Sequence, residues 1–255
     1  MNRWCPIALA VLAIALPATA YLPPASAILK HVAQRRGELS LHAMEVRGTI
    51  SFAGEAARKA SSATGLPLSK EELSAPAVLL LKLPERCRLE LRPEGAAATS
   101  RPAVWERGTR ESGQRALETI DGARALVQGL CTLLGERGGN GPSAERALAH
   151  ALSARGVSLG DVALGRMSGR VAWVLGGRPQ ETRPQAWVDK QSLQVLRLLA
   201  TLANGPRDVR LLEFGSPAGG DIFPRTVEVW SKGELEVRFT TEQVTPNPRL
   251  SDVLF

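Results

Sequence analysis

The chain contains few of the residues from which metal and catalytic sites are usually built. Its 255 residues include three histidines, three cysteines and one tyrosine. His31, His42 and His150 lie apart from one another in unlike surroundings, which predicts solvated or locally packed imidazoles rather than metal ligands. We therefore expect no metal and no cofactor.

Sequence motifs of common enzyme classes are also missing. The segment 214–217, Phe-Gly-Ser-Pro, lacks the Gly-x-Ser-x-Gly pattern of a serine nucleophile, and the glycine-rich segment 138–143 lacks the lysine of a phosphate loop. Asp189, Glu213 and Asp221 lie at predicted strand ends or turns, where acidic side chains are normally solvated. We expect a protein that is not an enzyme.

No apolar run is long enough for a membrane-spanning helix. Arg3 is followed by an apolar run at 5–16, about half the ~20 residues that a spanning helix needs. Ala18-Thr19-Ala20 then places small residues at the two positions that a signal peptidase reads. The sequence predicts a secretory signal over residues 1–20, cleavage after Ala20, and a mature single domain at 21–255 in the periplasm.

Basic residues outnumber acidic ones without forming a block. The formal charge is +7, and removal of Arg3 with the signal leaves +6. The arginines are spread along the chain, so the sequence gives little support to nucleic-acid binding. Export and a basic surface fit transient contact with anionic lipid head groups, an acidic partner, or simply a soluble surface.

Two cysteines remain after cleavage, and both are predicted to point inward. Cys87 alternates with Leu89 and Leu91, the period-two pattern of the buried face of a strand. Cys131 lies on the apolar side of a predicted helix. In an oxidising compartment the two cysteines could form a disulfide or remain separate buried thiols. The sequence leaves both alternatives open.

Apolar residues at spacings of three and four predict three helices. A short amphipathic helix is expected at 26–36, with Ser26 as its N-cap. Two more are expected at 119–134 and 144–155. The glycine-rich segment 135–141 between them is interpreted as a flexible hinge.

The rest of the chain is predicted to form one antiparallel sheet. Strands are expected at 44–52, 77–83, 86–91, 170–175, 185–189, 193–200, 208–214, 225–230 and 234–244. The later strands follow one another at roughly ten-residue spacing with short turns, which favours antiparallel neighbours over crossover units. Residues 53–75, rich in alanine, serine and glycine, are expected to be a mobile connection.

Three segments near the end of the chain show a family resemblance. They are Gln185-Ala186-Trp187-Val188-Asp189-Lys190, Phe223-Pro224-Arg225-Thr226-Val227-Glu228-Val229, and Asn247-Pro248-Arg249-Leu250-Ser251-Asp252-Val253-Leu254-Phe255. Their order resembles the LolA family of periplasmic outer-membrane lipoprotein carriers and the sensor domains that share its fold. The resemblance covers residues 185–255 together with the N-terminal helix and the first strand.

This resemblance implies an α+β fold with a strongly curved antiparallel sheet, an unclosed half-barrel whose concave face is covered by helices. A concave apolar face under removable helices can bind acyl chains. The implied lining residues are Val46, Ile50, Phe52, Leu79, Leu81, Leu89, Leu91, Trp173 and Leu211. The implied lid residues are Leu126, Leu130, Leu148 and Leu152. Each could equally fill an ordinary core.

One position departs from the family pattern. Carriers of the family have an arginine, important for cargo transfer, just before the proline of the second strand, where this chain has Leu83 before Pro84. Lys82 is adjacent but is predicted to point to the opposite face of the strand. The sequence therefore predicts a hydrophobic-ligand-binding envelope protein, similar to a lipid or lipoprotein carrier. The alternative is an envelope sensor or protein-interaction module with the same fold.

Overall fold

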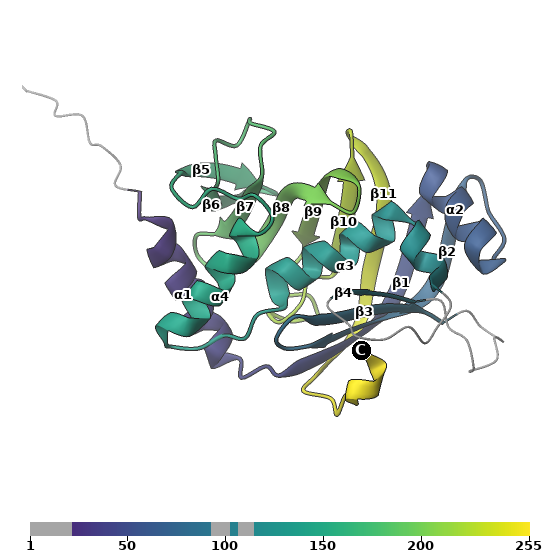
Figure 1. The fold of residues 1–255 in the computed structure, drawn as a ribbon, viewed down its shortest axis with the longest axis horizontal. Helices are drawn as coiled ribbons and strands as arrows, with labels where there is room; N and C mark the ends of the chain where they lie inside the picture. Colours follow the sequence, from purple (N-terminus) through teal and green to yellow (C-terminus); the bar gives the residue numbers. More distant parts are fainter. Residues whose placement is uncertain (1–21, 93–102, 107–114) are drawn as a thin grey trace, which may run out of the picture.

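The computed structural model describes residues 22–92, 103–106 and 115–255, and in this part of the chain one open sheet is packed against helices (Figure 1). The predicted signal peptide lies outside the described residues, and so does the segment 94–100, whose small residues predict a loop. None of the helices in the described part is long and apolar enough to cross a membrane.

The eleven strands of the described chain form a single antiparallel sheet. They are β1 (Ala43–Ala53), β2 (Glu72–Lys82), β3 (Arg86–Leu91), β4 (Ala103–Glu106), β5 (Val162–Met167), β6 (Arg170–Leu175), β7 (Gln185–Asp189), β8 (Val195–Leu202), β9 (Gly205–Leu212), β10 (Thr226–Ser231) and β11 (Glu234–Pro246). Their order is β4-β3-β2-β1-β11-β10-β9-β8-β7-β6-β5. Because β4 and β5 are both edges, the sheet is unclosed, as the resemblance implied.

Four α-helices cover the concave face. They are α1 (Ala25–Glu38), α2 (Gly54–Thr64), α3 (Asp121–Leu134) and α4 (Pro142–Ser153), and 3₁₀ turns follow at η1 (Arg115–Thr119) and η2 (Asp252–Leu254). α3 crosses the sheet and contacts β3, β4 and β8 to β11. α1 and α4 pack together at one end, and α2 lies at the other (Figure 1).

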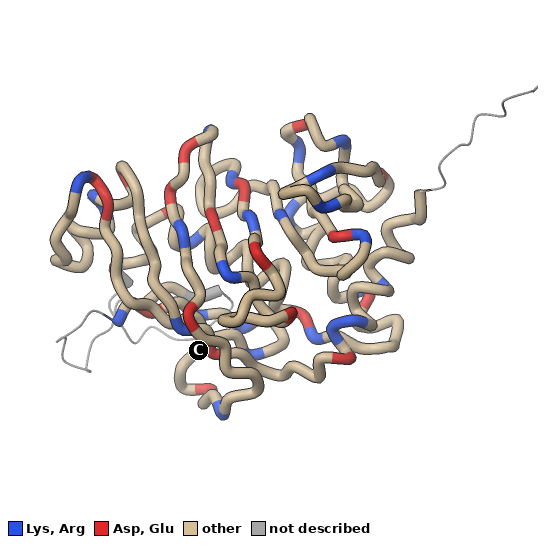
Figure 2. The backbone as a smooth tube through the Cα atoms, turned by 180° about the vertical axis from the view of Figure 1, so that it is seen from behind, with Lys and Arg blue, Asp and Glu red and all other residues tan. Residues whose placement is uncertain are grey.

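Alternation along the strands separates an apolar inner face from a polar outer face. Ile50 lies opposite Phe239 in the sheet, Phe239 lies opposite Val227, and all three side chains are fully buried under the helices. Seen from the outer side of the sheet, acidic and basic residues are interspersed along the strands (Figure 2). There Arg197 donates two hydrogen bonds to Asp208, at 2.6 and 2.8 Å. The helices therefore bury the face that the alternation predicted to be apolar.

The interpretation of residues 53–75 as a mobile connection is wrong. The first part is helix α2, and β2 begins at Glu72. Alanine has the highest helix propensity, and Ala57 and Ala60 are fully buried, so small side chains are sufficient for this face of α2. The helix ends at Gly65, whose φ of 72° is a left-handed conformation that glycine adopts without strain.

Three further expectations differ from the structure. Ser26 is not an N-cap, because α1 begins at Ala25 and the preceding Pro24 offers no capping side chain. β4 and β5 were not predicted. Strand β5 contains Gly165, where a Cβ atom would lie 2.7 Å from the Trp187 ring. The ring occupies the space that a side chain at this position would fill, so the strand lacks the alternating apolar pattern by which the others were predicted.

The last nine residues return to the outer face of β2. The Phe255 side chain is buried against Val78 and Leu80. The Lys82 Nζ donates to Asp252 at 2.8 Å and holds the pKa of that carboxyl below its usual range. Strand β2 is therefore buried on both faces, which explains why its sequence is apolar at nearly every position from Ala77 to Leu83.

Candidate functional site

The predicted lining residues share the concave side of the sheet. Neighbouring strands place Val46 opposite Leu79 and Leu79 opposite Leu89. Eight of the nine are at most 1% exposed: Val46, Ile50, Phe52, Leu79, Leu81, Leu89, Leu91 and Leu211. Trp173 is only partly buried, at the edge of the same core. These residues form part of the hydrophobic core.

The predicted lid residues form the other half of that core. Leu126 and Leu130 on α3 are fully buried, and Leu148 and Leu152 on α4 are nearly so. α3 lies very close to the sheet because Gly129 has no side chain; a Cβ atom there would lie 2.7 Å from a methyl carbon of Val209. Helix α3 is therefore packed more tightly against the sheet than a loose lid would be.

Cys87 and Cys131 form a disulfide between β3 and the last turn of α3. Their Cα atoms are 5.8 Å apart, and 44 positions separate the residues in sequence. The pairing requires both cysteines to face inward, as their apolar spacing predicted. It fixes the C-terminal end of α3 to the sheet.

The segment 135–141 is not the free hinge that its glycines suggested. Gly139 donates its amide hydrogen to the carbonyl of Ala33 in α1 at 2.9 Å. A Cβ atom on Gly138 would lie 2.2 Å from the amide nitrogen of Gly37. These glycines allow the backbones of the α3–α4 connection and of the end of α1 to touch. The connection is docked rather than loose.

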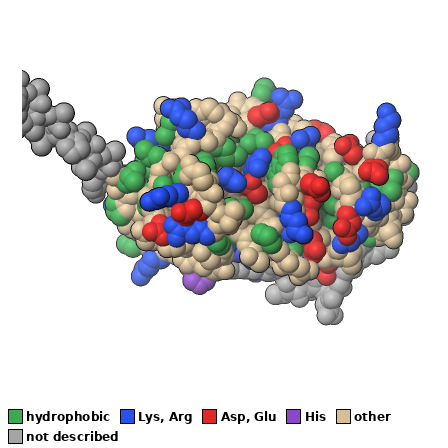
Figure 3. Space-filling model, turned by 90° about the horizontal axis from the view of Figure 1, so that it is seen from above, with side chains coloured by type: hydrophobic (Ala, Val, Ile, Leu, Met, Phe, Trp, Pro, Cys, Tyr) green, Lys and Arg blue, Asp and Glu red, His purple; other side chains and the backbone are tan. Residues whose placement is uncertain are grey.

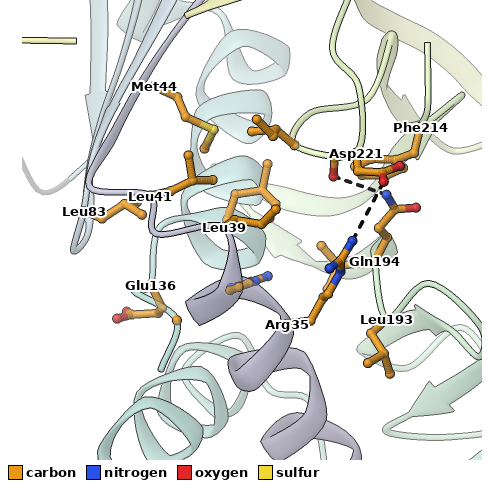
Figure 4. A pocket seen from close by; sticks show the side chains of 15 residues that line it. Arg35, Leu39, Leu41, Met44, Leu83, Glu136, Leu193, Gln194, Phe214 and Asp221 are labelled. Atoms are coloured by element: carbon orange, nitrogen blue, oxygen red, sulfur yellow. Dashed lines mark hydrogen bonds and ion pairs between the residues drawn. The ribbon is translucent and has the colours of Figure 1, made fainter. Parts of the chain in front are cut away.

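A small apolar pocket opens at this end of the half-barrel (Figure 4). The end of α1, the start of β1, the end of α3, the β7–β8 turn and the 213–225 loop together form its walls. Its volume is about 60 Å³. The apolar lining residues are Leu39, Leu41, Met44, Leu83, Leu134, Leu193, Val195, Phe214 and Ile222. We call this the mouth pocket.

Polar side chains join the elements at the rim of the mouth pocket. Arg35 on α1 lies 3.8 Å from the carboxylate of Asp221, and Gln194 donates to the main-chain carbonyl of Asp221 at 3.2 Å (Figure 4). Arg35 also pairs with Glu38 at 2.8 Å. Because Arg35, Glu38 and Asp221 are exposed, their ion pairs contribute little to stability.

Leu83, which departs from the family pattern, lies in the wall of the mouth pocket. Its side chain is buried, whereas the adjacent Lys82 points to the outer face and binds Asp252, as the strand alternation predicted. An arginine does line the pocket, but it is Arg36 from α1. The sequence does not single out Arg36 from the other arginines, because no local pattern shows that the end of α1 lies beside β1 and β8.

The motif residues of the closing third have structural roles. Asp189 is buried rather than solvated as expected, and it accepts the amide hydrogens of Gln191 and Ser192 at 2.8 and 2.7 Å, which stabilises the β7–β8 turn. Asn247 accepts the amide hydrogen of His42 at 2.7 Å and so holds the end of β11 beside β1. Glu213 and Asp221 are exposed, as expected.

Two other surfaces are polar. A cleft of about 490 Å³ at the opposite end, beside α2 and the start of α3, is lined mainly by charged and polar residues, among them Lys59, Asp121 and Arg207. Seen from above, acidic and basic side chains are interspersed (Figure 3).

Within the described chain, no three His, Cys, Asp or Glu side chains are grouped as metal ligands would be. The mouth pocket is the better site for an apolar ligand.

No protein-family model and no curated protein matches the sequence. Among solved structures, the chain is similar to a DUF1329 family protein from Desulfovibrio piger, with 12% identity over 91% of this chain and 98% of that chain and a TM-score of 0.47. A LolA superfamily protein from Nitrosomonas europaea has 12% identity over 92% and 98% and a TM-score of 0.41.

A third similar structure is a domain from Vibrio parahaemolyticus that is termed an outer membrane lipoprotein-sorting protein. It has 8% identity over 87% of this chain and 93% of that chain, with a TM-score of 0.38. These similarities concern the arrangement of the chain and say nothing of a ligand.

Proposed function

We propose that this protein is exported to the periplasm and there binds a hydrophobic ligand, the acyl chain of a lipid or of a lipoprotein, without catalysing a reaction. The observation that supports this best is the mouth pocket, an apolar opening at the end of a half-barrel whose inner face is mostly apolar. Met44 belongs both to the pocket wall and to the buried core. A chain entering at the mouth would therefore continue along the inner face.

The ligand requires the helices to move. Sites for drug-sized ligands usually enclose ~300–1,000 Å³, whereas the mouth pocket measures about 60 Å³. The disulfide holds the C-terminal end of α3 on the sheet. We assign the opening to α4 and to the end of α1, which pack on each other and are joined to the sheet by weaker contacts at the rim. Ligand contacts would replace helix contacts at little net cost, since both are apolar.

Filling the mouth pocket should block binding. Leu41 is partly exposed in the pocket wall, so Leu41→Trp places an indole in the opening without overpacking the deep core. We expect the unmodified protein to take up a fluorescent fatty acid and the variant to bind at least about tenfold more weakly, a loss of the size expected when a well-packed apolar contact is removed. Fluorescence titration measures both.

Leu68→Trp is the matched control, because Leu68 is exposed after α2 and does not line the pocket. It should bind the probe as the unmodified protein does. If the unmodified protein takes up no probe, or if Leu41→Trp binds as well as Leu68→Trp, the carrier proposal is wrong. A sensor or interaction module of the envelope, which binds another protein, would then be the better assignment.

Export has its own test. The small residues at 18–20 after a short apolar run should direct cleavage, so the protein recovered from the periplasm should begin at Tyr21. N-terminal sequencing of the full-length product expressed in a Gram-negative host measures this. A product that still begins at Met1 and stays in the membrane fraction would contradict the prediction.

A further inference from the structure

The mouth pocket contains one buried cation. Arg36 lies in the last turn of α1, and its Nη2 donates to the carbonyl oxygen of Leu133 near the end of α3. Arg36 as a residue is only partly buried, but its Nη1 atom has no contact with solvent and no hydrogen-bond partner. A buried donor without a partner is costly and uncommon in folded proteins.

No acidic group in the described chain neutralises Arg36 directly. Burial lowers the pKa of Arg36 to about 10, and the charge of Glu136 partly offsets this effect. The guanidinium therefore remains charged at neutral pH. Among the described residues no carboxylate oxygen lies within 4.0 Å of it, and in Figure 4 the carboxylate of Glu136 points away from the apolar side chains of the pocket. Arg35 and Asp221 at the rim pair with each other.

The walls around this cation are apolar. Leu39, Leu41 and Met44 lie on one side and Phe214 on the other (Figure 4). Even in the closed form, a pocket of about 60 Å³ has room for one or two water-sized groups, which is enough for a carboxylate. A guanidinium and a carboxylate also match in shape and charge.

We propose that the ligand is a free fatty acid, whose carboxylate is bound by Arg36 in the mouth pocket while its acyl chain follows the inner face of the half-barrel. This inference rests on the proposed function and adds the head group. Without an anion, Nη1 is an unfilled donor beside apolar side chains. Solvent does not touch Nη1 in the closed form, so a carboxylate reaches it only once the helices open, and Nη1 then gains a charge-assisted hydrogen bond.

The test compares parinaric acid with its methyl ester, which has the same chain and no charge. The unmodified protein should bind the acid about tenfold more tightly or better, the ratio expected for one charge-assisted hydrogen bond. Equal binding of acid and ester would overturn the head-group inference while leaving the proposed function intact. Binding of neither probe would instead contradict the proposed function. This comparison needs no substitution, so it does not depend on how a variant folds.

Three variants test whether Arg36 causes the preference for the acid over the ester. Arg36→Gln should abolish the preference, so that acid and ester bind equally, and Arg36→Lys should keep part of the preference. Glu136→Gln should increase the preference for the acid over the ester, because it removes a negative charge near the bound carboxylate. A purely structural Arg36 would lower the melting temperature and weaken both probes together. An acid preference that survives in Arg36→Gln overturns the proposal.

A phosphate-headed competitor tests whether the head group is a carboxylate. Lysophosphatidate of the same chain length should displace parinaric acid much less effectively than palmitate does. Equal displacement by the two would show that the site does not select a carboxylate, and would overturn the assignment of a fatty acid.

Discussion

Removing the Cys87–Cys131 disulfide should lower the free energy of unfolding by about 4 kcal/mol. The bond closes a loop of 44 residues, and in the chain-entropy model such a cross-link raises the free energy of the unfolded chain by that amount. Urea unfolding of the mature chain, with and without a reductant, measures the difference. The double variant Cys87→Ala, Cys131→Ala should give the same lower value with or without the reductant.

The reductant has one target, since the third cysteine, Cys5, lies in the predicted signal peptide. A shift caused by reduction in the double variant would therefore indicate an unrelated effect of the reagent. An unfolding midpoint of the unmodified protein that is the same in both conditions would contradict the prediction. The result also bears on the lid, because only a disulfide present in solution confines the opening to α4 and α1.

Phe255→Ala should destabilise the protein by about 3 kcal/mol, the lower end of the range for a buried phenylalanine. The side chain is 1% exposed and closes a small outer cluster with Val78 and Leu80. Its loss exposes the outer face of β2 and leaves the segment held there by polar contacts, such as the ion pairs of Asp252 with Lys82 and Arg86. Chemical unfolding measures the change in stability, and amide exchange of β2 shows where it acts.

Val253→Ala is the matched control. It lies in the same short turn, η2, but is 62% exposed, so its truncation should change the free energy of unfolding by at most about 0.5 kcal/mol. Equal effects of the two substitutions would mean that the segment is not anchored through Phe255. Binding of fatty-acid probes should be unchanged in both variants, since the outer cluster lies on the outer face of β2 and shares no residue with the mouth pocket.

The sequence predicted most strands because their information is local. Alternation in 44–52 and 86–91 assigns each side chain to one face, and β1 and β3 follow that assignment. The alternation of apolar and polar residues is lost where a second surface covers a strand or where small side chains replace large ones. Strand β2 is apolar on both faces because Phe255 covers one of them. Helix α2 was missed because alanines can bury its inner face without the large apolar residues that make a helix visible in a sequence.

Part of the candidate site could likewise be predicted from local sequence patterns, and part could not. Periodicity showed that Cys87, Cys131 and the lining residues point inward, and the small residues at 18–20 predicted export. Only the tertiary structure shows that the two cysteines meet, and only it brings Arg36 beside Leu83 and Phe214. These three residues come from α1, the end of β2 and the 213–225 loop. Their proximity depends on long-range packing of the sheet and helices, which no local pattern encodes.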